Sequence, residues 1–175
     1  MSDNGRISLL FLINILLYFF IGMINNMASG FSIHLHLDVL LLIFSGLYLT
    51  RLSGLFLAAL LGLLADAANP VPTGTFLVGY LAIWLFFVWC QRRIRRQNKI
   101  HVRTVAVVAQ LSWIIFLGLF LGKGALSEWP YWQRILSDVL VSCVCLYLVV
   151  WPWCRTQNSL LYSLGWDLEA QISHR

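Results

Sequence analysis

The chain alternates long apolar runs with short polar segments, and this pattern predicts helices that cross a membrane. A spanning helix needs roughly 20 predominantly apolar residues, and about 17 can be enough. We expect six spans, at residues 7–23, 32–50, 52–68, 75–90, 102–122 and 135–153. The segments between them are short. The prediction is therefore an all-α, polytopic integral membrane protein, with residues 1–175 forming a single membrane domain built as a compact bundle of about six helices.

The second and third spans are closely spaced and marginal in length. The second runs from Asp38 to Thr50, and reaches residue 32 only if the polar segment before it contributes. Arg51 then leads directly into the third span, which predicts a tight antiparallel hairpin. A helix rises 1.5 Å per residue and a bilayer core is about 30 Å thick. The pattern leaves open whether these two helices cross fully or only partly.

Composition supports a membrane protein and excludes a large soluble domain. The chain is 60% hydrophobic and 11% charged, with a mean hydropathy of +0.81. Soluble domains are about 45–50% apolar and about 25% charged. A soluble core of 175 residues could not bury this much apolar surface.

The basic residues predict the orientation, because Lys and Arg concentrate in cytoplasmic loops. If the N-terminus is cytoplasmic, only Lys123 and Arg134 fall on the outer side of the membrane. The other ten basic residues fall on the inner side: Arg6, Arg51, Arg92, Arg93, Arg95, Arg96, Lys99, Arg103, Arg155 and Arg175. We therefore expect both termini in the cytoplasm.

One cytoplasmic loop carries most of this charge. Its basic residues are Arg92, Arg93, Arg95, Arg96, Lys99 and Arg103. Anionic membrane lipids attract such a segment by about 1 kcal/mol per basic residue. The loop either only sets the topology or also docks a cytoplasmic partner, and the sequence leaves both open.

Small residues recur at every fourth position of the third span, at Gly54, Ala58 and Gly62. Membrane helices pack closely where small residues let their backbones approach. We expect this stripe to be a helix-packing seam, either inside the chain or against a partner helix. Gly118 and Gly122 form a second pair of the same kind.

Asp66 continues the spacing of the stripe and precedes a turn with the sequence Asn-Pro-Val-Pro. The end of a helix disfavours an anion, whereas the start of the next helix favours one. Asp66 therefore caps the fourth span across the turn, pairs with Arg134 or Lys123, or contacts a partner on the outer face.

The sequence lacks recognisable catalytic or metal-binding patterns. His34 and His36 have no third ligand nearby in the sequence, and the four cysteines resemble neither a disulfide framework nor a zinc site. No metalloprotease, nucleophile-elbow or P-loop motif is present. We expect no enzymatic activity, no cofactor, no bound metal and no nucleic-acid partner.

The region from Gly54 to Leu81 carries a pattern of spaced glycines, a Leu-Leu-x-Asp end, a short turn with Pro and Gly, and a following Tyr-Leu pair. The residues that form it are Gly54, Gly62, Leu63, Leu64, Asp66, Gly74, Leu77, Tyr80 and Leu81. Over about 30 residues this pattern resembles the rod shape-determining protein MreD family. The rest of the chain is similar only in length and in its pattern of spans.

The resemblance implies a non-catalytic component of the bacterial cell-elongation machinery, located in the bacterial cytoplasmic (inner) membrane. Such a protein would act as a scaffold for MreC-like and MreB-like shape proteins and for peptidoglycan synthases. Membrane lipids would surround its helices. The alternative is a substrate-binding membrane subunit of a vitamin-type transporter. That function would need polar groups that converge on a pocket from outside, and His34, His36, Asp38 and Asp66 are the candidates.

Overall fold

The computed structural model describes residues 3–31, 34–91, 98–121 and 129–164. These residues form six α-helices and one turn of 3-10 helix, and no strand occurs among them. The helices are α1 (Asp3–Ala28), α2 (Asp38–Leu47), α3 (Arg51–Ala68), α4 (Thr75–Gln91), α5 (Lys99–Leu121) and α6 (Trp129–Ser163), and the 3-10 turn is Ser29–Phe31. The all-α prediction is confirmed.

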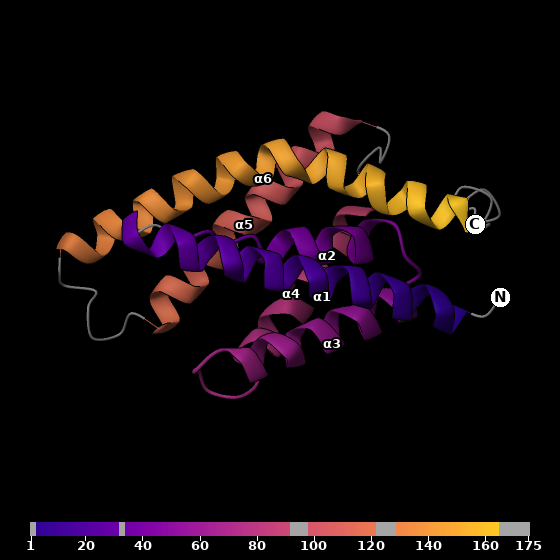
Figure 1. Ribbon diagram of the computed structural model, residues 1–175, viewed down its shortest axis with the longest axis horizontal. Coiled ribbons are helices and arrows are strands. Elements are labelled where there is room, and N and C mark those ends of the chain that lie inside the picture. Colours follow the sequence, from indigo (N-terminus) through magenta and orange to yellow (C-terminus); the bar gives the residue numbers. More distant parts are fainter. Residues whose placement is uncertain (1–2, 32–33, 92–97, 122–128, 165–175) are drawn as a thin grey trace.

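The helices form an elongated bundle (Figure 1). The two long helices, α1 and α6, run along the bundle in opposite directions, so the start of α1 and the end of α6 lie at the same end. The α3–α4 hairpin lies along one side, and α2 lies within the bundle, in contact with α1, α3, α4, α5 and α6. Successive helices reverse direction from α1 to α6.

Four of the helical segments are long and apolar enough to cross a membrane, which makes the chain a membrane protein. They are Ile7–Ala28, Arg51–Ala68, Lys99–Phe120 and Trp129–Ser163. The helix α4 has 17 residues, most of them apolar. At 1.5 Å per residue it is about 26 Å long, slightly less than the thickness of a bilayer core, about 30 Å.

The helix within the span expected at residues 32–50 is shorter than that span, because it has only ten residues, Asp38–Leu47. At 1.5 Å per residue α2 is about 15 Å long, half the thickness of the hydrocarbon core. Every residue from Val39 to Leu47 is buried. A helix that is apolar on all sides belongs in a protein interior as readily as in lipid. The neighbouring helices, and not lipid, therefore surround α2.

Both long helices extend beyond the apolar runs expected at 7–23 and 135–153. The helix α6 has 35 residues, about 52 Å, and continues through Pro152 into a polar sequence. Its extension is anchored where the Gln157 side-chain amide donates to Asn14 Oδ1 of α1 at 3.2 Å. By contrast, α3, α4 and α5 begin and end within three residues of the runs at 52–68, 75–90 and 102–122.

Candidate functional site

The small residues of α3 pack against other helices of the same chain. A Cβ atom added to Gly62 would lie 2.7 Å from the Cα of Leu77 on α4, closer than real Cβ contacts allow. One added to Gly54 would lie 2.5 Å from the carbonyl oxygen of Ser45 on α2. Ala58, between them, is fully buried. The stripe is thus a seam along which α3 meets α2 and α4.

Asp66 caps the start of α4. Its Oδ2 accepts hydrogen bonds from the backbone N–H groups of Gly74 at 3.0 Å and Leu77 at 3.1 Å, and its Oδ1 accepts from Phe76 N–H at 2.9 Å. The first N–H groups of a helix have no partner inside the helix, and the helix dipole favours an anion there. The sequence left three roles open for Asp66, and this geometry corresponds to the first, a cap on the fourth span.

The turn between α3 and α4 is fixed from both ends. The Asn69 side-chain amide donates to the Ala65 carbonyl at 2.8 Å and to the Tyr18 hydroxyl of α1 at 3.1 Å. Pro70 follows and cannot continue a helix. At the other end Gly74 has φ of +94°, a left-handed conformation that favours glycine. The hairpin is therefore held in one geometry against α1.

A second carboxylate joins three helices. Asp38, the first residue of α2, accepts hydrogen bonds from the Tyr80 hydroxyl of α4 at 2.7 Å and from the Trp113 indole N–H of α5 at 2.9 Å. Both aromatic side chains are buried. Trp113 also lies against Gly79, where an added Cβ would overlap its ring. Sequence reasoning missed this cluster, although an acid directly before a wholly apolar run is a signal that it has buried partners.

Of the second glycine pair, Gly118 lies at a contact between α5 and α6. A Cβ added to Gly118 would lie 3.1 Å from Ile135 Cδ1, and the Tyr131 hydroxyl donates to the Gly118 carbonyl at 2.7 Å, so Gly118 packs α5 against α6. Gly122 lies outside the described residues.

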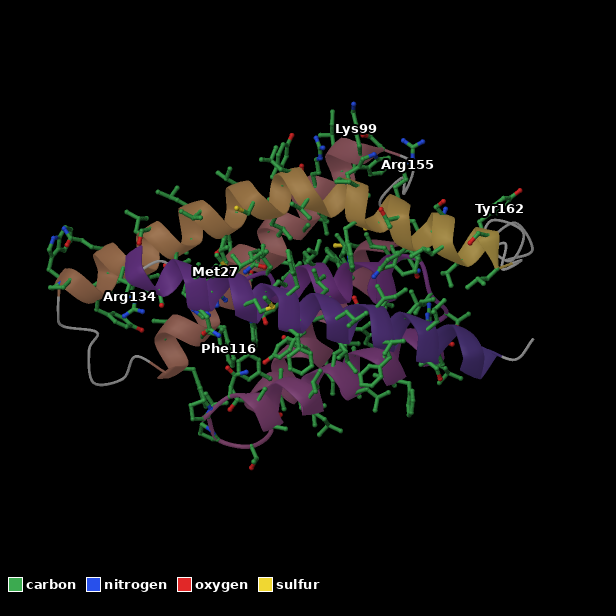
Figure 2. All side chains as sticks on the ribbon, in the orientation of Figure 1. Met27, Lys99, Phe116, Arg134, Arg155 and Tyr162 are labelled. Carbon is green, nitrogen blue, oxygen red and sulfur yellow. The ribbon has the colours of Figure 1, made fainter. Side chains whose placement is uncertain are left out.

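The predicted basic loop divides into two parts. Its first four arginines, Arg92, Arg93, Arg95 and Arg96, lie outside the described residues. Lys99 is exposed at the start of α5, whereas Arg103 is half-buried with its guanidinium 4.9 Å from the centre of the Tyr147 ring on α6. Figure 2 shows Lys99 and Arg155 on one side of the bundle, and Arg134 near the opposite end of α6 from Arg155.

An apolar cavity of about 280 Å³ lies between α4 and α5. Its lining residues are Val78, Gly79, Ala82, Ile83, Phe86, Ala109, Ser112, Trp113 and Phe116. The hydroxyl of Ser112 is already bonded to the carbonyl of Val108 at 3.0 Å. The four polar residues suggested for a small-molecule pocket are absent from this lining, so the cavity does not bring them together.

The carboxylates of Asp38 and Asp66 join helices by accepting hydrogen bonds from neutral donors. Among the residues that the structure describes, no group of three or more His, Cys, Asp or Glu side chains could hold a metal ion. Comparison with known protein families, with curated proteins and with solved structures found no match for this chain.

Proposed function

We propose that the chain is a non-catalytic, multi-pass component of the bacterial cytoplasmic membrane that acts as a scaffold in the cell-elongation machinery, as its resemblance to MreD implies. Its partners would be MreC-like and MreB-like shape proteins and peptidoglycan synthases. In this role the protein provides these partners with binding surfaces on a rigid helical framework.

The observation that carries the proposal is the position of the residues that form the resemblance. Gly54 and Gly62 are the contact points of α3, Asp66 caps α4, and Gly74 takes the left-handed conformation of the turn. These residues together build one hairpin, and a protein of the resembled family would need them for the same packing. That agreement supports the proposal.

The proposed orientation follows from charge. Exposed Arg51, Lys99 and Arg155 all occur in the segments assigned to the inner side, together with the arginines of the 92–97 segment. Cytoplasmic loops are enriched in such residues. With the N-terminus inside, both ends of the chain face the cytoplasm, where an MreB-like filament would lie.

No specific observation favours the substrate-binding alternative. A capture subunit needs a few polar groups that converge on a cavity. The cavity between α4 and α5 has an apolar lining, whereas Asp38 and Asp66 are bonded within the bundle. We therefore do not propose it as a second function.

The test is depletion of the protein in the cell that encodes it, which on this proposal is a rod-shaped bacterium. Depletion should convert rods into spheres, and affinity isolation of the tagged chain from gently solubilised membranes should recover shape proteins and peptidoglycan synthases. Depleted cells that keep their rod shape, with no such partner recovered, would contradict the proposal.

A further inference from the structure

The segment of residues 34–36, which belongs to no helix and is here called the strap, is held by a side chain of α1. The Leu35 N–H donates to Asn25 Oδ1 at 2.7 Å, and the Leu35 carbonyl accepts from Asn25 Nδ2 at 3.0 Å. The Asn25 amide therefore pairs with the backbone of Leu35 on both of its edges, and these two bonds fix which atom is oxygen and which is nitrogen.

Side chains of α6 hold the strap through its other residues. The His34 N–H donates to Asp138 Oδ1 at 2.8 Å, and the His36 N–H donates to Ser142 Oγ at 2.9 Å. Asp138 and Ser142 are buried and lie one helical turn apart. The strap thus bridges α1 and α6 immediately before α2 begins, with side chains in place of a neighbouring strand.

The His34 ring takes part in the same contact. Its Nε2 lies 3.3 Å from Asn25 Nδ2, and an amide NH₂ can only donate a hydrogen bond. Nε2 must therefore be the acceptor, which requires a neutral imidazole. A proton on Nε2 would point an N–H group at the NH₂ group of Asn25, so that two donors would face each other. Asn25 is also the residue that holds Leu35. The His36 ring, with its centre 4.7 Å away, would repel the new charge if it were protonated as well.

The surroundings favour a neutral His34. Partial desolvation, followed by the neighbouring His36, holds the pKa of the solvent-exposed His34 below its ordinary value of 6.5. Arg134 of α6 acts in the same direction, while Asp138 of α6 and Asp38 of α2 oppose it. On α1 the group that faces the ring is the uncharged Asn25.

The sign of the pH effect follows from proton linkage. Above about pH 6.5 His34 is neutral whether the strap is bound or released, so the bound strap keeps its full stability. Below that pH the released strap binds a proton more readily than the bound strap does. The bound state therefore loses stability as pH falls from 6.5 to the lowered pKa of His34.

We propose that the strap is a proton-controlled latch, bound to α1 and α6 while His34 is neutral and released when His34 takes up a proton. Release would loosen α1 from α6 at this end of the bundle and free the start of α2. On the orientation proposed above, this end faces the outside of the cell. The latch itself does not depend on the proposed function.

Amide hydrogen exchange of the full-length protein in lipid nanodiscs tests the latch. Exchange is followed in the peptide that carries residues 34–37 between pH 7.5 and 5.5, after correction for the intrinsic effect of pH. Protection should stay constant above about pH 6.5 and fall below it by up to tenfold per pH unit, the limit for release coupled to one proton. Equal protection at the two pH values would overturn the proposal.

Two variants assign the effect to one ring. His34→Gln keeps a neutral acceptor at the same distance along the side chain, so its protection should no longer fall at pH 5.5. His101→Gln removes another exposed histidine, on α5, and should retain the wild-type pH dependence. An undiminished fall in His34→Gln would overturn the assignment.

If His34→Gln itself weakens the contacts of the strap, a measurement on the wild-type chain still tests the latch. Histidine NMR signals, assigned by comparison with His34→Gln, should show His34 titrating below 6.5 and losing its neutral form over the pH range in which strap protection falls. A His34 titration at or above 6.5, or one outside that range, would contradict the latch.

Discussion

At the residue scale, single atoms decide how closely the helices approach. Gly62 lets α3 touch the backbone of α4 at Leu77, and the Asp66 carboxylate satisfies three N–H groups at the start of the same helix. The spacing of small residues predicted a seam, and the position of Asp66 before a turn predicted a cap among other possibilities. Neither pattern could identify the facing residues, because a seam inside the chain and one against a partner have the same spacing.

Substitution of Gly62 by alanine should destabilise the protein. The added Cβ meets the backbone of α4, which can yield only if the helices separate, and overpacking of this kind costs roughly 1–3 kcal/mol. Thermal unfolding in detergent measures the effect. The matched control is Gly22→Ala, because an added Cβ there meets nothing within 4 Å. Equal melting temperatures for the two variants would argue against a tight seam.

Removal of the Asp66 carboxylate should weaken the start of α4. Asp66→Ala leaves three backbone donors without their acceptor, and loss of a helix cap costs about 0.5–2 kcal/mol. Asp66→Asn keeps one acceptor oxygen and should fall between alanine and wild type. Hydrogen exchange should show the loss of protection concentrated in residues 74–78. Unchanged exchange in Asp66→Ala would contradict the capping role.

At the element scale, hydropathy identifies apolar runs but does not identify what surrounds them. The runs that became α3, α4 and α5 are close to their predicted bounds, because each lies between clear polar or turn signals. The short helix α2 was not predictable in this way, since an apolar run is equally suited to lipid and to a protein interior. The segment before it, residues 34–36, is held by Asn25, Asp138 and Ser142, which are distant in the sequence.

The contact between Asp38 and Trp113 should contribute to the position of α2. Trp113→Phe removes the indole N–H that donates to Asp38 at 2.9 Å, and it also leaves a space where the larger buried ring was packed. Hydrogen bonds between membrane helices contribute roughly 0.6 kcal/mol on average, and a cavity in a packed interior adds to that loss. We expect a loss of stability of at least about 0.6 kcal/mol in denaturant titrations. Trp129→Phe, at an exposed site on α6, should change stability by less than about 0.5 kcal/mol.

At the scale of the whole molecule, the alternating helices and the separated charges predict two different faces. Impermeant thiol reagents can distinguish them in intact cells if the four native cysteines are replaced. Gln133→Cys, at an exposed position early in α6, should react from outside. Ser159→Cys, at an exposed position near the other end of α6, should react only after the membrane is permeabilised. The reverse pattern would overturn the orientation. Cys90 and Cys154 are unsuitable reporters because both are buried.

The measurement that tests the central claim most directly compares two glycine substitutions in living cells. Gly62→Leu and Gly22→Leu add the same side chain to membrane helices, but only the first opposes the backbone of a neighbouring helix. We predict that cells with Gly62→Leu become round and lose their MreC-like partner from affinity isolates, at normal abundance of the protein in the membrane. Cells with Gly22→Leu should remain rods. Normal rods and normal partner recovery with Gly62→Leu would contradict a scaffold organised around the α3–α4 hairpin.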